Sequence, residues 1–480
     1  MPPSPGYRPD PRYLSLGEGF ADAVVPARFP QRVLRFRNQR WAAEIGLGEL
    51  TDEEWRRAFW SFEPLPDNLP VALATRYHGH QFRQYNPDLG DGRGFLFAQL
   101  RDGAGRLLDL GTKGSGRTPY SRGGDGRLTL KGGVRELLAT EMLEALGVPT
   151  SKTFSIFETG ERLQRSDEPS PTRACVLVRL SHSHLRFGTF QRHAYHGDRA
   201  RLRRLVEHCA EVYFPDLDEK DRPHALFVAA AARTAELAGR WMASGFVHGV
   251  LNTDNMNITG ESFDYGPWRF LPRYDPSFTA AYFDSAGLYA YGRQMEAARW
   301  NLERLAEALA PLSPEAPWHS ALEGFAGAAH AALGAAVLER LGLLSAGADQ
   351  DEATVAALWS YLREVDLPFA QIFHDWFGGE ASVDRARQSP FARHYARPAF
   401  AKLRRALARH EPREPERLSH PYFARPRPVD LLVGEVEELW ARIDLYDDWR
   451  PLRWKVRDIR AMGAALGRAS DPQRTRWPEA

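Results

Sequence analysis

The hydrophobic pattern of this chain changes near residue 190, and that change limits the folds it can adopt. Between about residues 71 and 190, short β-prone runs such as 95–100 and 107–110 alternate with glycine turns, which indicates a sheet. After about residue 191 the pattern becomes largely helical and includes an alanine-rich run at 225–244. A sheet-rich half followed by a helical half predicts an α+β fold with two lobes.

One helix interrupts the predicted sheet. Gly147 and Pro149 would end it, and its apolar residues lie on one face: Val134, Leu137, Leu138, Met142 and Ala145. In the second half, long amphipathic runs are centred on 300–312, 320–341 and 352–362, and a Pro- and Arg-rich connecting loop is expected at 411–428. We therefore expect three parts, which are an N-terminal extension packed on the body (1–70), a sheet-rich N-lobe (71–190) and a helical C-lobe (191–480).

Composition excludes several classes of protein. The 480 residues are 43% hydrophobic, and 63 basic residues nearly balance 62 acidic ones, so no whole-chain charge favours nucleic acid or an anionic membrane. No apolar run approaches the roughly 20 residues of a membrane-spanning helix, and the start does not resemble a secretion signal. The two cysteines, Cys175 and Cys209, form neither a disulfide framework nor a zinc pattern. A cytoplasmic globular protein is expected, without a nucleic-acid or membrane partner.

The most specific chemical signal lies in the helical half. Residues 248–255 read His-Gly-Val-Leu-Asn-Thr-Asp-Asn, and 264–266 read Asp-Tyr-Gly. These two segments resemble a compressed version of the H-R-D-x-x-x-x-N and D-F-G motifs of protein kinases. Phosphoryl and nucleotidyl transfer need an Asp to orient a hydroxyl and an Asn/Asp pair to hold Mg²⁺. The residues between, 255–264, are expected to form a hairpin that brings its two ends together.

Lys113 is the next candidate. It is one of only six lysines, and it lies at the end of the 107–110 run within Gly-Thr-Lys-Gly-Ser-Gly, where small residues let the backbone approach phosphates. Glu136, on the predicted helix, is placed as the αC glutamate of a kinase is relative to its β3 lysine. An ion pair between the two would hold the ammonium against a phosphate, whereas the alternative is an ordinary surface lysine.

Two glycine segments also suit an anion. Residues 90–94 (Gly-Asp-Gly-Arg-Gly) and 123–127 (Gly-Gly-Asp-Gly-Arg) each place an arginine beside unobstructed backbone N–H groups. Neither matches the P-loop pattern G-x-x-x-x-G-K-[ST], which disfavours a P-loop NTPase. Arg179 and Arg186 lie seven residues apart on either side of His182 and His184, and no third ligand for a metal is evident there.

Together these motifs carry a specific resemblance. In order along about residues 70–305, eight segments resemble those of the selenoprotein O (SelO/YdiU) family: 77–82, 90–94, 109–122, 133–136, 186–190, 248–255, 264–267 and 274–278. The resemblance implies a protein-kinase-like bilobal fold and a protein adenylyltransferase that moves AMP from ATP to Ser, Thr or Tyr hydroxyls. It also implies that ATP binds inverted relative to kinases.

The resemblance further implies roles for individual residues. Asp254 would be the base, Asn255 and Asp264 would coordinate Mg²⁺, with Mn²⁺ as the alternative ion, and Glu136 would support Lys113. If Lys113, Arg179 and Arg186 form a deep cationic pocket, the charged end of the triphosphate binds there and pyrophosphate leaves. By the same resemblance, the expected nucleotide site comprises Gly90, Gly92, Arg93, Lys113, Asp125, Gly126, Arg179, Arg186 and Asp264.

Two alternatives stay open, and two segments depart from the family pattern. A Ser/Thr/Tyr kinase would release ADP, and a nucleotide-binding pseudokinase would not catalyse transfer. Family members often carry a cysteine or selenocysteine near the C-terminus, whereas this chain ends without one, so redox control through such a thiol is not expected. Residues 281–287 are less polar than the family norm. The expected partners are ATP and acceptor proteins, and the expected state is a monomer.

Overall fold

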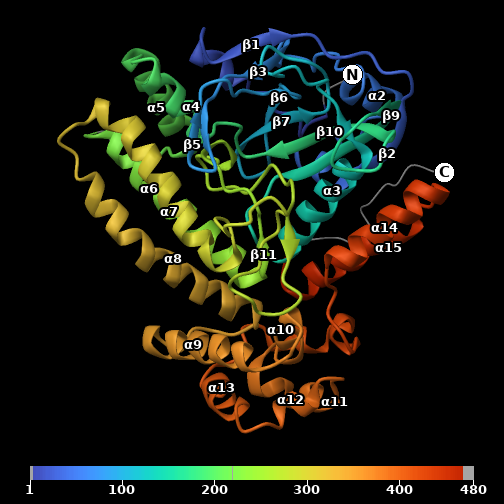
Figure 1. The fold of residues 1–480 in the computed structure, drawn as a ribbon, viewed down its shortest axis with the longest axis vertical. Helices are drawn as coiled ribbons and strands as arrows, with labels where there is room; N and C mark the ends of the chain where they lie inside the picture. Colours follow the sequence, from blue (N-terminus) through green and yellow to red (C-terminus); the bar gives the residue numbers. More distant parts are fainter. Residues whose placement is uncertain (1–3, 219, 469–480) are drawn as a thin grey trace.

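The computed structural model describes residues 4–218 and 220–468. An antiparallel sheet forms the upper part of the molecule, with strand order β1-β3-β6-β7-β10-β9-β2 and β8 paired to β10 (Figure 1). The strands of this sheet are β1 (Ala21–Val24), β2 (Val33–Arg37), β3 (Ala72–Thr75), β6 (Leu96–Arg101), β7 (Leu107–Lys113), β8 (Leu128–Thr129), β9 (Lys152–Leu163) and β10 (Thr172–Ser181). Two short pairs lie apart from it: β4 (Gly79–Gln81) with β5 (Gln84–Asn86), and β11 (Phe246–Val247) with β12 (Arg269–Phe270).

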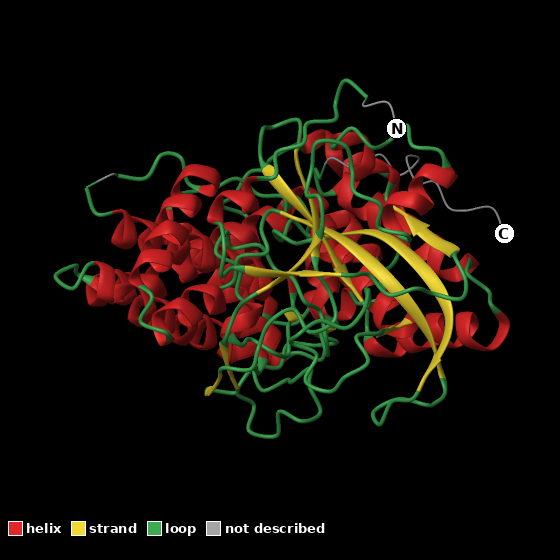
Figure 2. Cartoon of the chain, turned by 90° about the horizontal axis from the view of Figure 1, so that it is seen from above, coloured by secondary structure: helices red, strands yellow, loops and turns green. Residues whose placement is uncertain are grey.

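The central strands form because their side chains are buried on both faces. Every residue of β7 and β10 is buried, and the register pairs Lys113 with Leu177 and Gly111 with Arg179. Figure 2 shows the strands strongly twisted, with most of the helices gathered to one side. The edge strands β1 and β2 come from the first 70 residues, and α1 (Gln39–Glu44) and α2 (Asp52–Phe59) follow them.

Helix α3 (Leu130–Ala145) is the helix predicted within the sheet-rich half. The Thr129 side chain caps its start by accepting a hydrogen bond from Gly132 N, and Gly147 follows its end with φ of +76°. Gly133 packs so closely on β10 that a Cβ there would lie 2.6 Å from Cys175 Sγ. This close approach holds α3 against the sheet and fixes the position of Glu136.

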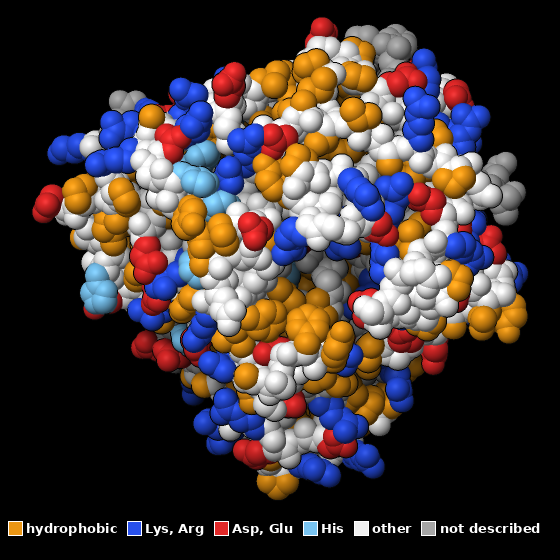
Figure 3. Space-filling model, turned by 45° about the horizontal axis from the view of Figure 1, so that its top comes forward, with side chains coloured by type: hydrophobic (Ala, Val, Ile, Leu, Met, Phe, Trp, Pro, Cys, Tyr) orange, Lys and Arg blue, Asp and Glu red, His pale blue; other side chains and the backbone are white. Residues whose placement is uncertain are grey.

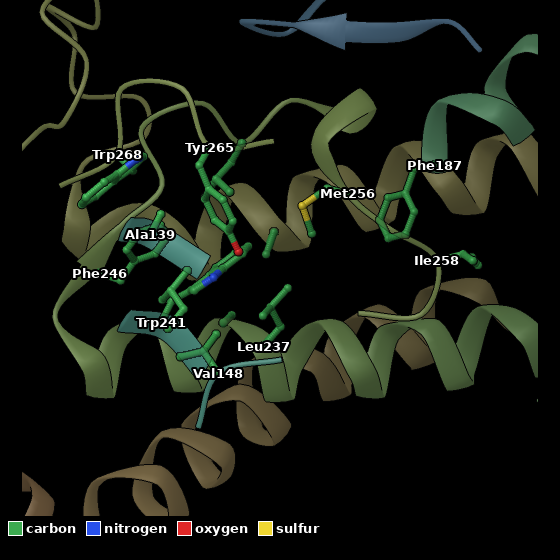
Figure 4. Packing of buried hydrophobic residues seen from close by; sticks show 14 of the residues in the cluster. Ala139, Val148, Phe187, Leu237, Trp241, Phe246, Met256, Ile258, Tyr265 and Trp268 are labelled. Carbon is green, nitrogen blue, oxygen red and sulfur yellow. The ribbon is translucent and has the colours of Figure 1, made fainter. Parts of the chain in front are cut away.

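The chain after residue 186 is mainly helical, as predicted. Figure 4 shows Leu237 and Trp241 of α6 packed near Met256, Tyr265 and Trp268 from the loops above them. The helices of this half are α4 (Phe187–Tyr195), α5 (Arg199–Tyr213), α6 (Arg222–Ser244), α7 (Gln294–Leu309), α8 (Trp318–Arg340), α9 (Ala348–Glu364), α10 (Phe369–Asp375), α11 (Val383–Gln388), α12 (Ala392–Tyr395), α13 (Phe400–Leu407), α14 (Val433–Tyr446) and α15 (Arg450–Ala465). The molecule is therefore a mixed α and β protein with an antiparallel, sheet-rich N-terminal region and a helical C-terminal part.

The sequence was expected to contain no apolar run near the length of a membrane-spanning helix, and helix α8 departs from that expectation. Its 23 residues are long and apolar enough, by length and composition alone, to cross a membrane. Its Leu333 region packs on α6, where a Cβ at Gly239 would lie 2.5 Å from Leu333 N. Helices of globular proteins often meet the same criterion, and 39% of the apolar window of α8 is buried inside the molecule.

The last two helices return from the helical part to the sheet-rich part (Figure 1). Arg460 of α15 donates two hydrogen bonds to Glu141 of α3, and both side chains are buried. At the turn between α14 and α15, Asp447 accepts a hydrogen bond from Arg173 of β10 at 2.7 Å. The C-terminal helices thus hold both α3 and the sheet, while the cysteine-free chain end lies outside the described residues.

Candidate active site

A cavity of about 660 Å³ lies between the sheet-rich and helical parts. Every nucleotide-site, metal and base residue predicted from the sequence lines it, whereas Glu136 lies behind Lys113. The predicted residues in the lining are Gly90, Gly92, Arg93, Lys113, Asp125, Gly126, Arg179, Arg186, Asp254, Asn255 and Asp264. Figure 3 shows one face of the molecule hollowed near its centre, with basic side chains above the hollow and apolar ones below it.

Lys113 forms the predicted ion pair. Its Nζ lies 2.6 Å from Glu136 Oε2 and 3.6 Å from Asp264 Oδ1, and the lysine is 8% exposed. Strand β7 sets the position of the lysine, and α3 sets that of the glutamate. An ordinary surface lysine is therefore excluded.

Arg179 and Arg186 meet Lys113 at the same carboxylate. Arg179 Nη1 pairs with Asp264 Oδ1, and Arg186 Nη1 lies 2.6 Å from Asp264 Oδ2. The Arg186 guanidinium also lies 4.4 Å from the centre of the Tyr77 ring, a cation–π contact. Burial would raise the pKa of Asp264, but the two arginines and Lys113 lower it well below its usual value. Asp264 is thus ionised and neutralises part of the charge of Lys113, Arg179 and Arg186, which we call the cationic cluster.

Asp254 lies in a short 3-10 turn, Thr253–Asn255. Its Oδ1 is buried and forms no hydrogen bond with the described residues, and burial raises the pKa of Asp254 to about 6. Asn255 Nδ2 donates to Val250 O at 3.0 Å, so the side-chain oxygen remains as an acceptor. An unpartnered buried carboxylate oxygen is suited to accept a proton or a ligand.

The predicted hairpin across 255–264 is wrong. Asn257 forms a bridge with Arg186, and Ser262 forms one with Thr150, so the two arms pair with other segments and not with each other. Asn255 and Asp264 nevertheless line one cavity. Buried His248 ties the two motifs together, because its ring Nε2 lies 3.0 Å from Phe263 O and its backbone N–H donates to Gln294.

The glycine segments have a packing role that the sequence did not indicate. A Cβ at Gly90 would lie 2.3 Å from the Tyr120 ring, and a Cβ at Gly92 would lie 2.8 Å from Tyr120 O. Gly126 has φ of +70°, and a Cβ there would meet Gly116 O at 2.2 Å. These three glycines are therefore required by neighbouring protein atoms. Tyr120 is a cavity residue that sequence reasoning missed, although it lies within the quoted segment 109–122.

The outer part of the cavity carries further charge. Arg93 and Arg122 are exposed and form no ion pair with residues 4–218 or 220–468, and Arg122 has φ of +48°. Asp125 pairs with Arg165 at 2.8 Å, so its carboxylate is neutralised. Arg122 was not predicted, and its place as the last residue of segment 109–122 is the signal that could have found it.

The donor set suits Mg²⁺ bound together with a nucleotide. Among the residues that the structure describes, no group of three or more His, Cys, Asp and Glu could hold a metal ion. Asn255 and Asp264 line the cavity and would supply two oxygen ligands, and Mg²⁺ commonly takes one or two protein carboxylates plus substrate phosphates. An ion here would complete its shell from phosphate oxygens and water.

Comparison with known proteins shows the family to which the chain belongs. The family described as "Protein adenylyltransferase SelO" matches residues 7–460. "Protein nucleotidyltransferase YdiU" of Gloeobacter violaceus is 45% identical over 455 residues, covering 92% of each chain. The proteins of the same name from Synechocystis sp. and Vibrio cholerae are 52% identical over 322 residues and 40% identical over 316 residues; these matches cover 66% and 65% of this chain and 67% and 63% of the relatives. The chain therefore belongs to the SelO family of protein adenylyltransferases and is a nucleotidyltransferase.

Proposed function

We propose that this protein transfers AMP from ATP to serine, threonine or tyrosine hydroxyls of other proteins and releases pyrophosphate. The proposal includes a two-lobed, protein-kinase-like arrangement, in which the Lys113–Glu136 pair at 2.6 Å is the counterpart of the kinase lysine–glutamate pair. It also includes an inverted ATP, Mg²⁺ as cofactor and a monomeric enzyme.

The observation that carries the proposal is a gradient of burial among the cations of the cavity. Lys113, Arg179 and Arg186 are 8%, 4% and 2% exposed, whereas Arg93 and Arg122 are exposed. The β- and γ-phosphates hold most of the negative charge of ATP, so they bind best among the buried cations. The α-phosphate then lies nearer the opening, where an acceptor hydroxyl enters. A kinase needs the γ-phosphate in that outer position.

The residues present can carry out the transfer. The acceptor oxygen forms a bond to the α-phosphorus as the bond from that phosphorus to the bridging oxygen breaks, and the bridging oxygen leaves with pyrophosphate. Asp254 accepts the hydroxyl proton, because its Oδ1 has no partner and its pKa of about 6 makes it a stronger base than an exposed aspartate. Lys113, Arg179 and Arg186 stabilise the charge that develops on pyrophosphate.

When ATP binds, Lys113, Arg179 and Arg186 pair with phosphate oxygens in place of Asp264. In the structure, the three cations surround Asp264. Phosphate oxygens take over these contacts, which frees a carboxylate oxygen of Asp264. When bound by Asn255, Asp264 and the phosphates, Mg²⁺ supplies positive charge that neutralises the triphosphate, and Mn²⁺ is the alternative ion.

Two labels on ATP test the proposal. Incubation with an acceptor mixture should transfer label from the adenosine to protein, while label on the γ-phosphate leaves in pyrophosphate. Asp254→Asn is the matched control, which removes the base without changing the size of the side chain. Accumulation of γ-label on protein would establish a kinase instead, and no transfer of either label would establish a non-catalytic nucleotide-binding protein.

A further inference from the structure

Three exposed aromatic side chains lie together beside the cavity. Phe82, Tyr282 and Phe283 are 36%, 82% and 50% exposed. The ring centres of Phe82 and Phe283 are 5.8 Å apart, and those of Tyr282 and Phe283 are 5.1 Å apart. We call these residues the rim aromatic group. They come from segments 200 residues apart in the chain, so the fold brings them together.

The rim aromatic group is continuous with the active-site cavity. Asn252, which lines the cavity two residues before Asp254, accepts hydrogen bonds through Oδ1 from Phe82 N at 3.1 Å and from Tyr289 OH at 2.8 Å. On the other side, a Cβ at Gly249 would contact Ala280 and the cavity residue Pro267. The backbone of Phe82 is therefore hydrogen-bonded to the loop that presents the base, and the Phe283 ring packs on the Phe82 ring.

The backbone beneath Phe82 is strained. Phe82 and Arg83 form the two-residue turn of the β4–β5 hairpin and have φ of +50° and +65°. Asn and Gly are the usual residues of such a turn, and a bulky residue in this conformation costs about 1–2 kcal/mol. The hydrogen bond to Asn252 and packing on Tyr289 at 5.1 Å hold Phe82 there. A strained aromatic at an active-site rim indicates a requirement other than stability.

The nearby charged side chains largely have partners within the protein. Glu296 lies 3.2 Å from both Arg83 and Arg293, and Asp284 accepts hydrogen bonds from the backbone of Leu288 and Tyr289. The surface therefore offers apolar contact more than charge, and contact with exposed aromatics favours an apolar side chain.

We infer that the rim aromatic group docks the acceptor polypeptide by binding an apolar side chain close in sequence to the hydroxyl that is modified. This inference rests on the proposed function and extends it to the class of acceptor. It also assigns a role to the exposed side chains of Tyr282 and Phe283.

Two pools of synthetic peptides test the inference. Each 12-residue peptide has one Ser, Thr or Tyr at its centre among Gly, Asn, Lys and Glu, and one pool also has Leu or Phe within two positions of the hydroxyl. The wild type should label the apolar pool about tenfold faster with adenosine-labelled ATP. The Tyr282→Asn/Phe283→Asn variant should lose that preference, because both contacts are removed.

Two further variants keep the test decisive. Phe82→Asn should also lower labelling of the apolar pool while the protein stays folded, since Asn tolerates a positive φ. Tyr446→Asn, which changes an aromatic residue on α14 that is 68% exposed, is the control and should label like the wild type. ATP affinity by calorimetry should be the same for all variants.

The outcomes separate this inference from the proposed function. If Tyr282→Asn/Phe283→Asn retains the wild-type preference, the docking inference is wrong even when AMP transfer is present. A weaker affinity for ATP in that variant would show that the group binds nucleotide, and a change from dimer to monomer in light scattering would show self-association; either overturns it. Transfer of γ-label in place of adenosine label would overturn only the proposed function.

Discussion

At the scale of single residues, Asp254 combines an unpartnered carboxylate oxygen with a raised pKa. Asp254→Asn should lower the rate of AMP transfer by about 10²–10⁴-fold, the usual contribution of a general base. ATP affinity should change little, because Asp254 does not belong to the cationic cluster. Transfer kinetics and calorimetry on the same preparation measure both quantities, and a parallel loss of ATP binding would contradict the role of base.

Lys113 gives a second prediction at this scale. Lys113→Ala should weaken ATP binding by about 1.5–3 kcal/mol, the typical contribution of a hydrogen bond to a charged group, and should affect AMP binding much less. The reason is that the buried cations are expected to hold the terminal phosphates. Lys131→Ala is the matched control, since Lys131 pairs with Glu437 outside the cavity. Equal losses of ATP and AMP affinity in calorimetry would place Lys113 away from the terminal phosphates.

The sequence predicted which residues line the cavity, but it did not predict the packing contacts around them. Lys113, Arg179 and Arg186 lie together as expected, whereas their ion pairs with Asp264, which was expected as a Mg²⁺ ligand, were not predicted. The sequence predicted that Gly90 and Gly92 leave their backbone N–H groups open to an anion. In the structure, the Tyr120 ring lies beside Gly90 and the Tyr120 carbonyl oxygen lies beside Gly92. A contact between residues thirty positions apart leaves no local pattern, so sequence alone could not predict it.

At the scale of elements, the connection between α3 and α15 gives a third prediction. Arg460→Met should lower the free energy of unfolding by about 3–5 kcal/mol, because it leaves the Glu141 carboxylate buried without its partner. The double variant Arg460→Met/Glu141→Met should recover most of that loss, since apolar side chains of similar size replace both charges. Urea unfolding followed by tryptophan fluorescence measures the effect, and equal midpoints for wild type and single variant would refute it.

The predicted elements differ in how well sequence determined them. The runs at 107–110 and 225–244 became β7 and α6, because periodicity is a local property. The hairpin across 255–264 failed because Asn257 and Ser262 pair with residues 71 and 112 positions away. The edge strands β1 and β2 escaped prediction for the same reason, since their partners lie in β3 and β9.

At the scale of the whole molecule, the nucleotide is expected to join the two parts. Lys113 and Arg179 belong to the sheet, whereas Asp254 and Asp264 belong to the helical part. ATP with Mg²⁺ at 100 times its dissociation constant should therefore add about 2.7 kcal/mol to stability. Adenosine at the same concentration should add little, because it lacks the phosphates that contact the cations. Thermal unfolding curves compare the two, and equal shifts would show that the phosphates contribute nothing.

The contact between Arg460 and Glu141 also bears on how the protein is made. The two residues are 319 positions apart, so at about 5–20 residues per second a ribosome adds the arginine roughly 15–65 s after the glutamate. During that interval the Glu141 side chain of α3, which is buried in the complete molecule, has not yet met Arg460. The contact between α3 and α15 can therefore form only after the last of these helices has been synthesised, so this part of the packing is completed late.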